Sequence, residues 1–222
     1  MMNIILPFAP DQELEPGQHI SIPERLQRMT ADEFFAFCEA NSQLKLERDA
    51  TGTIEFQSMT GGQTGERNSE LNADLTIWNR NARLGRVFDS STGFQLPNGA
   101  VRSPDAAWVA NTRWEALTTE QRRKFPPLCP DFLVELRSAS DSMAELTVKM
   151  QEYIDNGCRL AWLIDPKNET VRVFRANGAV AVIESFDETL SGEDVLPGFR
   201  FALSLYTLSL LPANQVRIIQ GR

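Results

Sequence analysis

The chain has 222 residues, of which 42% are hydrophobic and 9% aromatic, and it carries a formal net charge of −8. The length indicates one domain with extensions rather than two full domains, and the apolar content excludes global disorder. The negative charge argues against nucleic-acid binding, because a basic surface usually supplies most of the affinity for a phosphate backbone.

Residue counts and missing motifs exclude several kinds of site. With His19 as the single histidine, a Ser-His-Asp triad or a multi-histidine zinc site is a poor expectation. The three cysteines have no CxxC spacing, which favours free thiols in a reducing cytosol over a disulfide framework or zinc ribbon. The sequence contains no Walker A or GxGxxG motif, so we expect no nucleotide cofactor. No apolar stretch is long enough to span a bilayer, which predicts a soluble, cytoplasmic protein without membrane contact.

The first third of the chain predicts an arm, a short helix, a hairpin and a long helix. Residues 1–27 are rich in proline and predict an extended N-terminal arm. Thr30 and Glu33 have capping-box spacing at the start of a helix. Two strand-like segments, LKLERDA and TIEFQSM, flank Thr51-Gly52 and predict a hairpin. After the glycine-rich residues 60–65, apolar residues at helical spacing predict a helix with Leu71, Leu75, Trp78 and Ala82 on its buried face.

The rest of the chain alternates strands with helical or polar segments. GRVFDSS and NGAVRSPDAAWVA predict two strands, and the polar TRWEALTTEQRRKFPP predicts a surface insertion. DFLVELR is a nearly continuous apolar run, typical of a central strand buried on both faces. Ser142 and Glu145 open a second helix, for which Gly157 is a suitable C-terminal stop. RLAWLID and TVRVFRA predict a further hairpin. This order fits an α/β domain with a mixed sheet and helices on its faces.

Two carboxylates, Asp105 and Glu135, lie within these apolar strand segments. A buried carboxylate is costly unless it is paired, protonated or bound to a cation. Pairing with Arg102 or Arg137 inside the core is one explanation, and Asp105 could also be a turn residue after Pro104. The functional interpretation is that both carboxylates bind a divalent metal ion from adjacent strands, since Mg²⁺ prefers one or two carboxylates together with waters and phosphate oxygens.

Lys149 is a candidate for the cation that completes such a site. It lies three residues after Leu146 and four before Tyr153, so it borders the inward face of the predicted helix. An ammonium there would stabilise developing negative charge or orient an attacking water. The alternative is an ordinary exposed helix lysine.

The segments PDAAWV, PDFLVELRSASDS, KMQEY and NGCRLAWLIDP occur in this order, after the hairpin LERDATGTIE. Together they resemble the Uma-type restriction endonuclease family of the PD-(D/E)XK nuclease superfamily, over roughly residues 28–205. The resemblance implies a restriction-endonuclease-like mixed β-sheet flanked by helices, with β-hairpin elaborations. It also implies a single nuclease domain over residues 28–222, after the arm formed by residues 1–27.

Site residues follow from the resemblance position by position. Asp105 resembles the metal-binding aspartate of the superfamily, Glu135 its second carboxylate, and Glu47 an additional acidic metal ligand; the Leu136 carbonyl would complete the metal shell. A (D/E)xK motif would place lysine at position 137, where this chain has Arg137. Arginine is always charged and could clamp a phosphate but not act as a base. The resemblance therefore implies that the lysine function has moved to Lys149.

The expected activity is Mg²⁺-dependent hydrolysis of DNA phosphodiester bonds, with Mn²⁺ as a substitute ion and a homodimer as the form that cuts both strands. One alternative is a catalytically silent module of the same fold that binds DNA or protein, which Arg137 and the overall acidity would suit. A two-carboxylate glycosidase is a more distant alternative, because it leaves Lys149 and Arg137 without a role.

The negative charge is unevenly distributed. Residues 1–77 contain 13 acidic and 5 basic residues, whereas residues 78–124 contain 8 basic and 4 acidic ones, a local charge of +4. We therefore expect residues 78–124 to line the DNA side and the acidic N-terminal third to face solvent or a partner.

Overall fold

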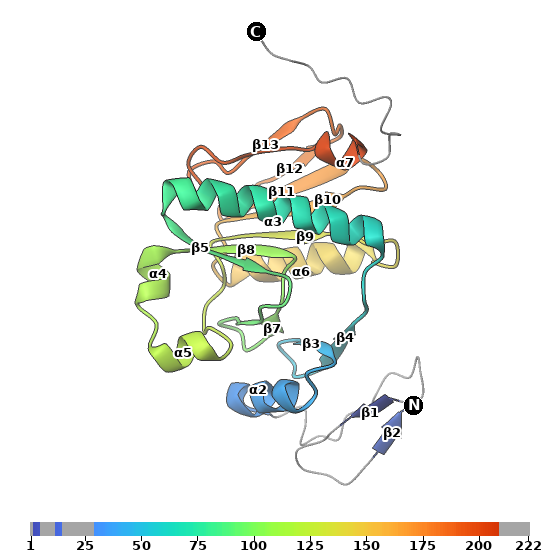
Figure 1. Cartoon of the computed structure of the whole chain (residues 1–222), viewed down its shortest axis with the longest axis vertical. Coiled ribbons are helices and arrows are strands. Elements are labelled where there is room, and N and C mark those ends of the chain that lie inside the picture. The colour runs from blue at the N-terminus through green and yellow to red at the C-terminus, as the bar shows by residue number, and fades with distance from the viewer. Residues whose placement is uncertain (1, 5–11, 15–28, 209–222) are drawn as a thin grey trace.

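The structure is a computed structural model and describes residues 2–4, 12–14 and 29–208 (Figure 1). Within the predicted N-terminal arm, β1 (Met2–Ile4) and β2 (Gln12–Leu14) form an antiparallel pair. The rest of the arm, including His19, lies outside the described residues. No helix among the described residues is both long enough and apolar enough to cross a membrane.

A six-stranded sheet forms the centre of the fold, in the order β12-β11-β10-β9-β8-β5. Strands β9 and β10 pair in parallel and the other neighbours are antiparallel, so the sheet is mixed, as the sequence predicts. The parallel pair needs a crossover, which α6 (Met143–Asp155) supplies. The strands are β5 (Gly85–Asp89), β8 (Ala106–Ala110), β9 (Phe132–Leu136), β10 (Leu160–Asp165), β11 (Thr170–Arg175) and β12 (Val180–Ile183).

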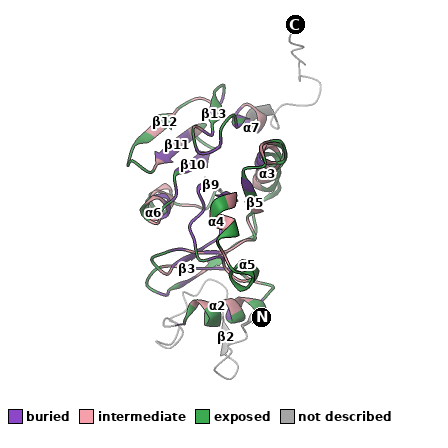
Figure 2. Ribbon diagram, turned by 90° about the vertical axis from the view of Figure 1, so that its left-hand side faces the viewer, coloured by how far each residue is buried: buried purple, intermediate pink, exposed green. Residues whose placement is uncertain are grey.

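Helices cover both faces of this sheet. Figure 2 shows α3 (Gly62–Ala82) and α6 on opposite sides of β9. Because side chains alternate along a strand, Val134 belongs to the core cluster that contains Leu71 of α3, while Leu133 belongs to the cluster that contains Tyr153 of α6. Every residue of β9 is buried, as expected for a central strand covered on both faces.

A second, four-stranded sheet lies below the central one in Figure 1, in the order β4-β3-β7-β6. The predicted hairpin forms from β3 and β4, with Gly52 in the turn at a φ of 92° that glycine adopts without strain. Helix α2 packs Phe34 and Phe37 against the apolar face of this sheet, and the predicted capping box of Thr30 and Glu33 begins the helix. The elements are α2 (Ala31–Ala40), β3 (Lys45–Arg48), β4 (Ile54–Gln57), β6 (Phe94–Gln95) and β7 (Val101–Arg102).

The polar segment after β8 forms two short helices, α4 (Asn111–Glu115) and α5 (Thr119–Arg123). This agrees with the predicted insertion between strands. The C-terminal part adds β13 (Thr189–Ser191), β14 (Arg200–Ala202) and α7 (Leu205–Leu208). The two strands pair with each other antiparallel.

One strand prediction is wrong in a way that affects the site. The segment NGAVRSPDAAWVA is not one strand: it divides into β7, which belongs to the small sheet, and β8, which belongs to the central sheet. Pro104 lies at the division, and it cannot donate a ladder hydrogen bond. Asp105 therefore stands at the entrance of β8, where the two sheets meet.

Tight packing of β5 against β8 at Gly85, and open space at Gly65 of α3, predict opposite effects for two glycine substitutions. A Cβ at Gly85 would overlap the Val109 carbonyl oxygen and the Trp108 ring, whereas one at Gly65 in α3 would meet nothing within 4 Å. We expect Gly85→Ala to lower the free energy of unfolding by about 1–3 kcal/mol. Gly65→Ala should raise it by about 0.5–1 kcal/mol, because alanine favours the helix. Urea unfolding of both variants tests this, and equal stability of the two would contradict the packing described for β5 and β8.

Candidate active site

The pairing of β8 and β9 places the two predicted carboxylates beside each other. In this antiparallel pair Ala106 lies opposite Val134, so Asp105 and Glu135 are the next residues along the two strands. Asp105 also binds β9 directly, because its Oδ2 accepts a hydrogen bond of 2.8 Å from the Leu136 N–H. The two carboxylates thus converge where the central sheet meets the small one.

Helix α3 holds Asp105 from its other side. The Asn68 side-chain amide donates to Asp105 Oδ1 at 2.9 Å, and the Asn72 amide donates to the Asp105 carbonyl oxygen at 3.0 Å. No motif in the sequence points to these asparagines. Their signal is weak: they lie one helical turn apart, beside the buried stripe through Leu71 and Leu75.

Glu135 faces α6 and is almost fully buried. Lys149 Nζ lies 2.9 Å from Glu135 Oε1, and the same oxygen accepts a 2.8 Å hydrogen bond from the Tyr153 hydroxyl. The Lys149 side chain is only 15% exposed, so it is not an ordinary surface lysine. Tyr153 is fully buried between Glu135 and the core beneath α6.

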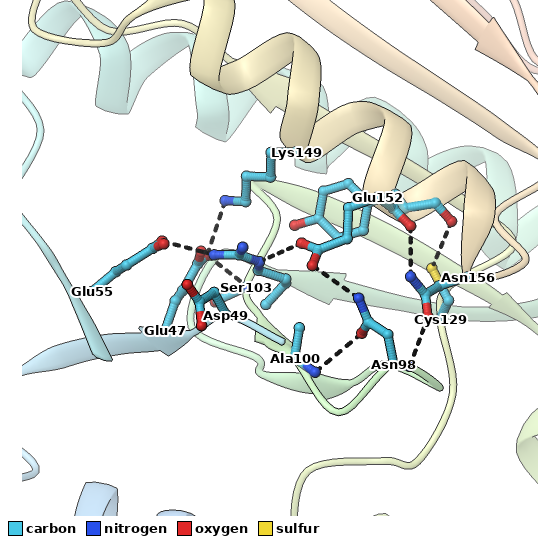
Figure 3. A network of polar contacts seen from close by, with 12 residues as sticks. Glu47, Asp49, Glu55, Asn98, Ala100, Ser103, Cys129, Lys149, Glu152 and Asn156 are labelled. Atoms are coloured by element: carbon cyan, nitrogen blue, oxygen red, sulfur yellow. Dashed lines mark hydrogen bonds and ion pairs between the residues drawn. The ribbon is translucent and has the colours of Figure 1, made fainter. Parts of the chain in front are cut away.

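Glu47 reaches the same lysine from β3 in the small sheet. Its Oε1 lies 3.0 Å from Lys149 Nζ and accepts a 2.9 Å hydrogen bond from the Ser103 N–H, while its Oε2 lies 3.3 Å from Arg102 (Figure 3). Both oxygens of Glu47 are therefore engaged within the protein. Lys149 stands between Glu47 and Glu135 and joins the two sheets through α6.

Arg102 is a second cation of the site, for which the sequence predicts no functional role. It does not pair with Asp105, the partner considered from their proximity in sequence. Besides Glu47 it contacts Glu55 and Glu152, each at 2.7 Å. Figure 3 shows its three partners Glu47, Glu55 and Glu152 grouped below Lys149. We call the following set the ion-pair network: Glu47, Glu55, Arg102, Glu135, Lys149 and Glu152.

Arg137 lies close in sequence to Glu135 but is bound elsewhere. Its Nη1 contacts Asp165 Oδ2 at 2.7 Å, and its Nε donates to the Asp141 carbonyl oxygen at 3.2 Å. Asp165 ends β10, the strand beside β9. The guanidinium therefore holds the loop after β9 to the neighbouring strand, and the structure gives it no contact with Asp105 or Glu135.

Burial and charge shift the titration of the buried groups in opposite directions. Burial raises the pKa of Glu135 to about 7, and the nearby Asp105 and Glu47 add to the effect although Lys149 opposes it. Burial would also raise the pKa of Glu47, but Lys149, the Ser103 N–H and Arg102 outweigh it and lower the pKa. Burial disfavours the Lys149 ammonium, yet Glu135 and Glu47 raise the pKa of Lys149 above its ordinary value. Lys149 therefore stays charged.

The donor set fits a hard divalent cation that keeps part of its water shell. Asp105 and Glu135 offer carboxylate oxygens, and no histidine or cysteine contacts either of them in the part of the chain that the structure describes. Nor does any group of three acidic, histidine or cysteine side chains there form a closed cage. Two carboxylates with solvent or substrate oxygens are what Mg²⁺ accepts.

A cleft of about 400 Å³ is lined by residues 58–64, which lead into α3, and by residues 138–140, which follow β9. It begins one residue after Arg137 and three after Glu135, and its lining is rich in serine, threonine and glycine. The cleft therefore lies beside the loop that follows β9, and neither Asp105, Glu135 nor Lys149 lines it.

The basic segment 78–124 does not form one surface at this site. Arg102 is buried in the ion-pair network, and Arg113 pairs with Asp131. Arg122 of α5 donates to the carbonyl oxygens of Trp114 and Glu115, and Lys124 pairs with Glu120 and with Asp32 of α2. Contact of this segment with DNA stays a prediction.

The mixed sheet between α3 and α6, with paired carboxylates where β8 begins and β9 ends, defines an α/β protein with a restriction-endonuclease-like fold. Residues 31–205 match the profile of the Uma2 family, described as "Putative restriction endonuclease", so the chain belongs to this family, as the sequence motifs predict.

Among solved structures, the chain resembles the "Crystal structure of a putative nuclease belonging to DUF820" from Anabaena variabilis ATCC 29413, with a TM-score of 0.66. The two share 20% sequence identity over 82% of this chain and 99% of that chain, a level that shows the fold alone. No curated protein matches the chain significantly.

The raised pKa of Glu135 predicts a pH-dependent stability of the metal-free protein. Because the folded state binds a proton with a pKa of about 7 against 4.5 for the free side chain, wild-type stability should fall as pH rises from about 4.5 to 7. Glu135→Gln cannot titrate and lacks this decline. The free energy of unfolding of the variant, relative to wild type, should therefore increase by up to about 3 kcal/mol between pH 5 and pH 8.

Urea titrations at several pH values measure this difference. Glu115→Gln, on the exposed surface, controls for the loss of one carboxylate. A difference between Glu135→Gln and wild type that stays constant from pH 5 to 8 would show that the buried Glu135 carboxylate is not destabilised.

Proposed function

We propose that the protein is a Mg²⁺-dependent endodeoxyribonuclease that hydrolyses phosphodiester bonds in DNA. The observation that carries the proposal is the Lys149 ammonium, buried between Glu47 and Glu135 next to Asp105. This arrangement puts two acidic oxygen donors and a permanently charged lysine at the junction of the two sheets, which family membership alone does not require.

Asp105 and Glu135 would hold the metal ion. The Leu136 N–H points at Asp105, and since the N–H and C=O of one strand residue point to the same side, the Leu136 carbonyl can join them. Glu47 is a weaker candidate, because a metal would have to displace Lys149, Ser103 or Arg102 from it. When bound, Mg²⁺ would neutralise a phosphodiester oxygen and lower the pKa of an attacking water.

Lys149 would act as a fixed cation rather than as a base. Its pKa is raised, so it keeps its proton and can donate a hydrogen bond to a developing negative charge. Glu47 contributes by holding Nζ in place, and Arg102 holds Glu47. Arg137 would support the loop after β9, since a direct contact with phosphate requires it to leave Asp165.

A catalytically silent module of the same fold is the second candidate. The observation that favours it is that Lys149, Arg102 and Arg137 are all paired with carboxylates inside the protein, so the ion-pair network could serve stability alone. Metal binding separates the two, because only the enzyme needs a cation and a bound cation would raise the unfolding temperature. A homodimer and a cytoplasmic location stay predictions.

Cleavage of supercoiled plasmid DNA with Mg²⁺ or Mn²⁺ tests the enzyme directly. We expect Asp105→Ala and Glu135→Ala to lower the cleavage rate at least about a hundredfold, because each removes a metal ligand. Glu115→Gln is the control: Glu115 is exposed on α4 and belongs neither to the ion-pair network nor to the proposed ligands. This variant should keep the wild-type rate.

Undiminished cleavage by Asp105→Ala and Glu135→Ala would remove both carboxylates from the mechanism. If wild-type protein neither binds Mn²⁺ nor cleaves DNA, the silent module is the correct description.

A further inference from the structure

Two asparagines of α3 donate hydrogen bonds to Asp105, one to its side chain and one to its main chain. Asn68 and Asn72 lie one turn apart on the same face of the helix. The Asn68 amide donates to Asp105 Oδ1 at 2.9 Å, and the Asn72 amide donates to the Asp105 carbonyl oxygen and to the Asn68 carbonyl oxygen, each at 3.0 Å. The helix is thereby fixed to the entrance of β8.

These contacts fix the orientation of the Asp105 carboxylate. Oδ1 accepts from Asn68 of α3 and Oδ2 accepts from the Leu136 N–H of β9, so each oxygen is held by a different element. A carboxylate oxygen has a second acceptor position, which stays available for another partner. Without the Asn68 donor, the carboxylate would be held at one oxygen and could rotate.

The same asparagines present two buried acceptors of their own. Asn68 Oδ1 and Asn72 Oδ1 are buried and have no hydrogen-bond donor among the described residues. Exchanging the amide nitrogen and oxygen of either side chain would not give these acceptors a donor. In Asn68 the exchange would place an amide oxygen against the Asp105 carboxylate, and in Asn72 against two carbonyl oxygens. Buried polar atoms rarely lack a partner, so a donor from outside the described chain is expected at this place.

We propose that Asn68 and Asn72 are positioning residues of the metal site: their amide N–H groups orient Asp105, and their amide oxygens accept hydrogen bonds from waters of a hydrated divalent cation. Mg²⁺ sheds its waters reluctantly and keeps several of them in protein sites, so donors of this kind accompany the ion. Partners that orient a metal ligand typically change metal affinity by about 10–100-fold. The proposal rests on the metal site of the proposed function but not on cleavage of DNA.

Mn²⁺ titration of the full chain by calorimetry tests this proposal, with DNA absent. We expect Asn68→Ala to weaken Mn²⁺ binding about tenfold or more, and Asn72→Ala to weaken it in the same direction. Asn79→Ala is the matched control, because Asn79 lies on the same helix and bonds to Gly85 and Trp108 at the other end of the sheet. It should lower the unfolding temperature of the metal-free protein and leave Mn²⁺ affinity unchanged.

Wild-type affinity in both Asn68→Ala and Asn72→Ala would overturn the proposal, as would an equal loss in Asn79→Ala, which would show a general effect of stability. If one of these two variants does not fold, the Mn²⁺ affinity of the other still tests the proposal. Wild-type protein that binds Mn²⁺ with the expected losses but does not cut DNA would support this proposal and contradict the nuclease. Cleavage with unchanged Mn²⁺ affinity in both variants would overturn this proposal alone, and absence of Mn²⁺ binding by wild type would overturn both.

Discussion

The buried ammonium of Lys149 is the interaction on which the site depends. It joins Glu47 of the small sheet to Glu135 of the central sheet, and α6 carries it between them. Without Lys149, Glu135 would be buried with no cation beside it and Glu47 would keep Arg102 alone, at a cost on the order of several kcal/mol. Ser103 and Arg102 also contact Glu47, which ties the small sheet to the residues just before Asp105 and β8.

The site is rich in negative charge even after its internal pairing. Arg102 and Lys149 are its cations, whereas its carboxylates are Glu47, Glu55, Asp105, Glu135 and Glu152. The excess falls on Glu135, whose pKa rises because it is buried and has Asp105 and Glu47 as neighbours. A divalent cation would relieve this repulsion, so the feature that lowers stability in the metal-free protein is the one that prepares the site for a metal.

Local patterns predicted much of the fold and the two central carboxylates. Thr30 and Ser142 cap helices as their spacing indicates, and the apolar run around Glu135 is a buried central strand. The rest depends on which strands become neighbours, and no local pattern records that. Arg102 meets Glu47 because β3 pairs with β7 across 53 residues, counted from Arg48 to Val101, and Arg137 is drawn to Asp165 because β10 lies beside β9.

We propose that Asp105 and Glu135 together bind a divalent cation beside Lys149. The most direct measurement is a crystal structure of the protein soaked with Mn²⁺, with anomalous difference density recorded near the manganese edge. We expect one peak within coordination distance of both carboxylates, with Lys149 still held by Glu47. Absence of a peak there at a Mn²⁺ concentration that saturates binding in solution, with the Lys149–Glu135 contact unchanged, would contradict it.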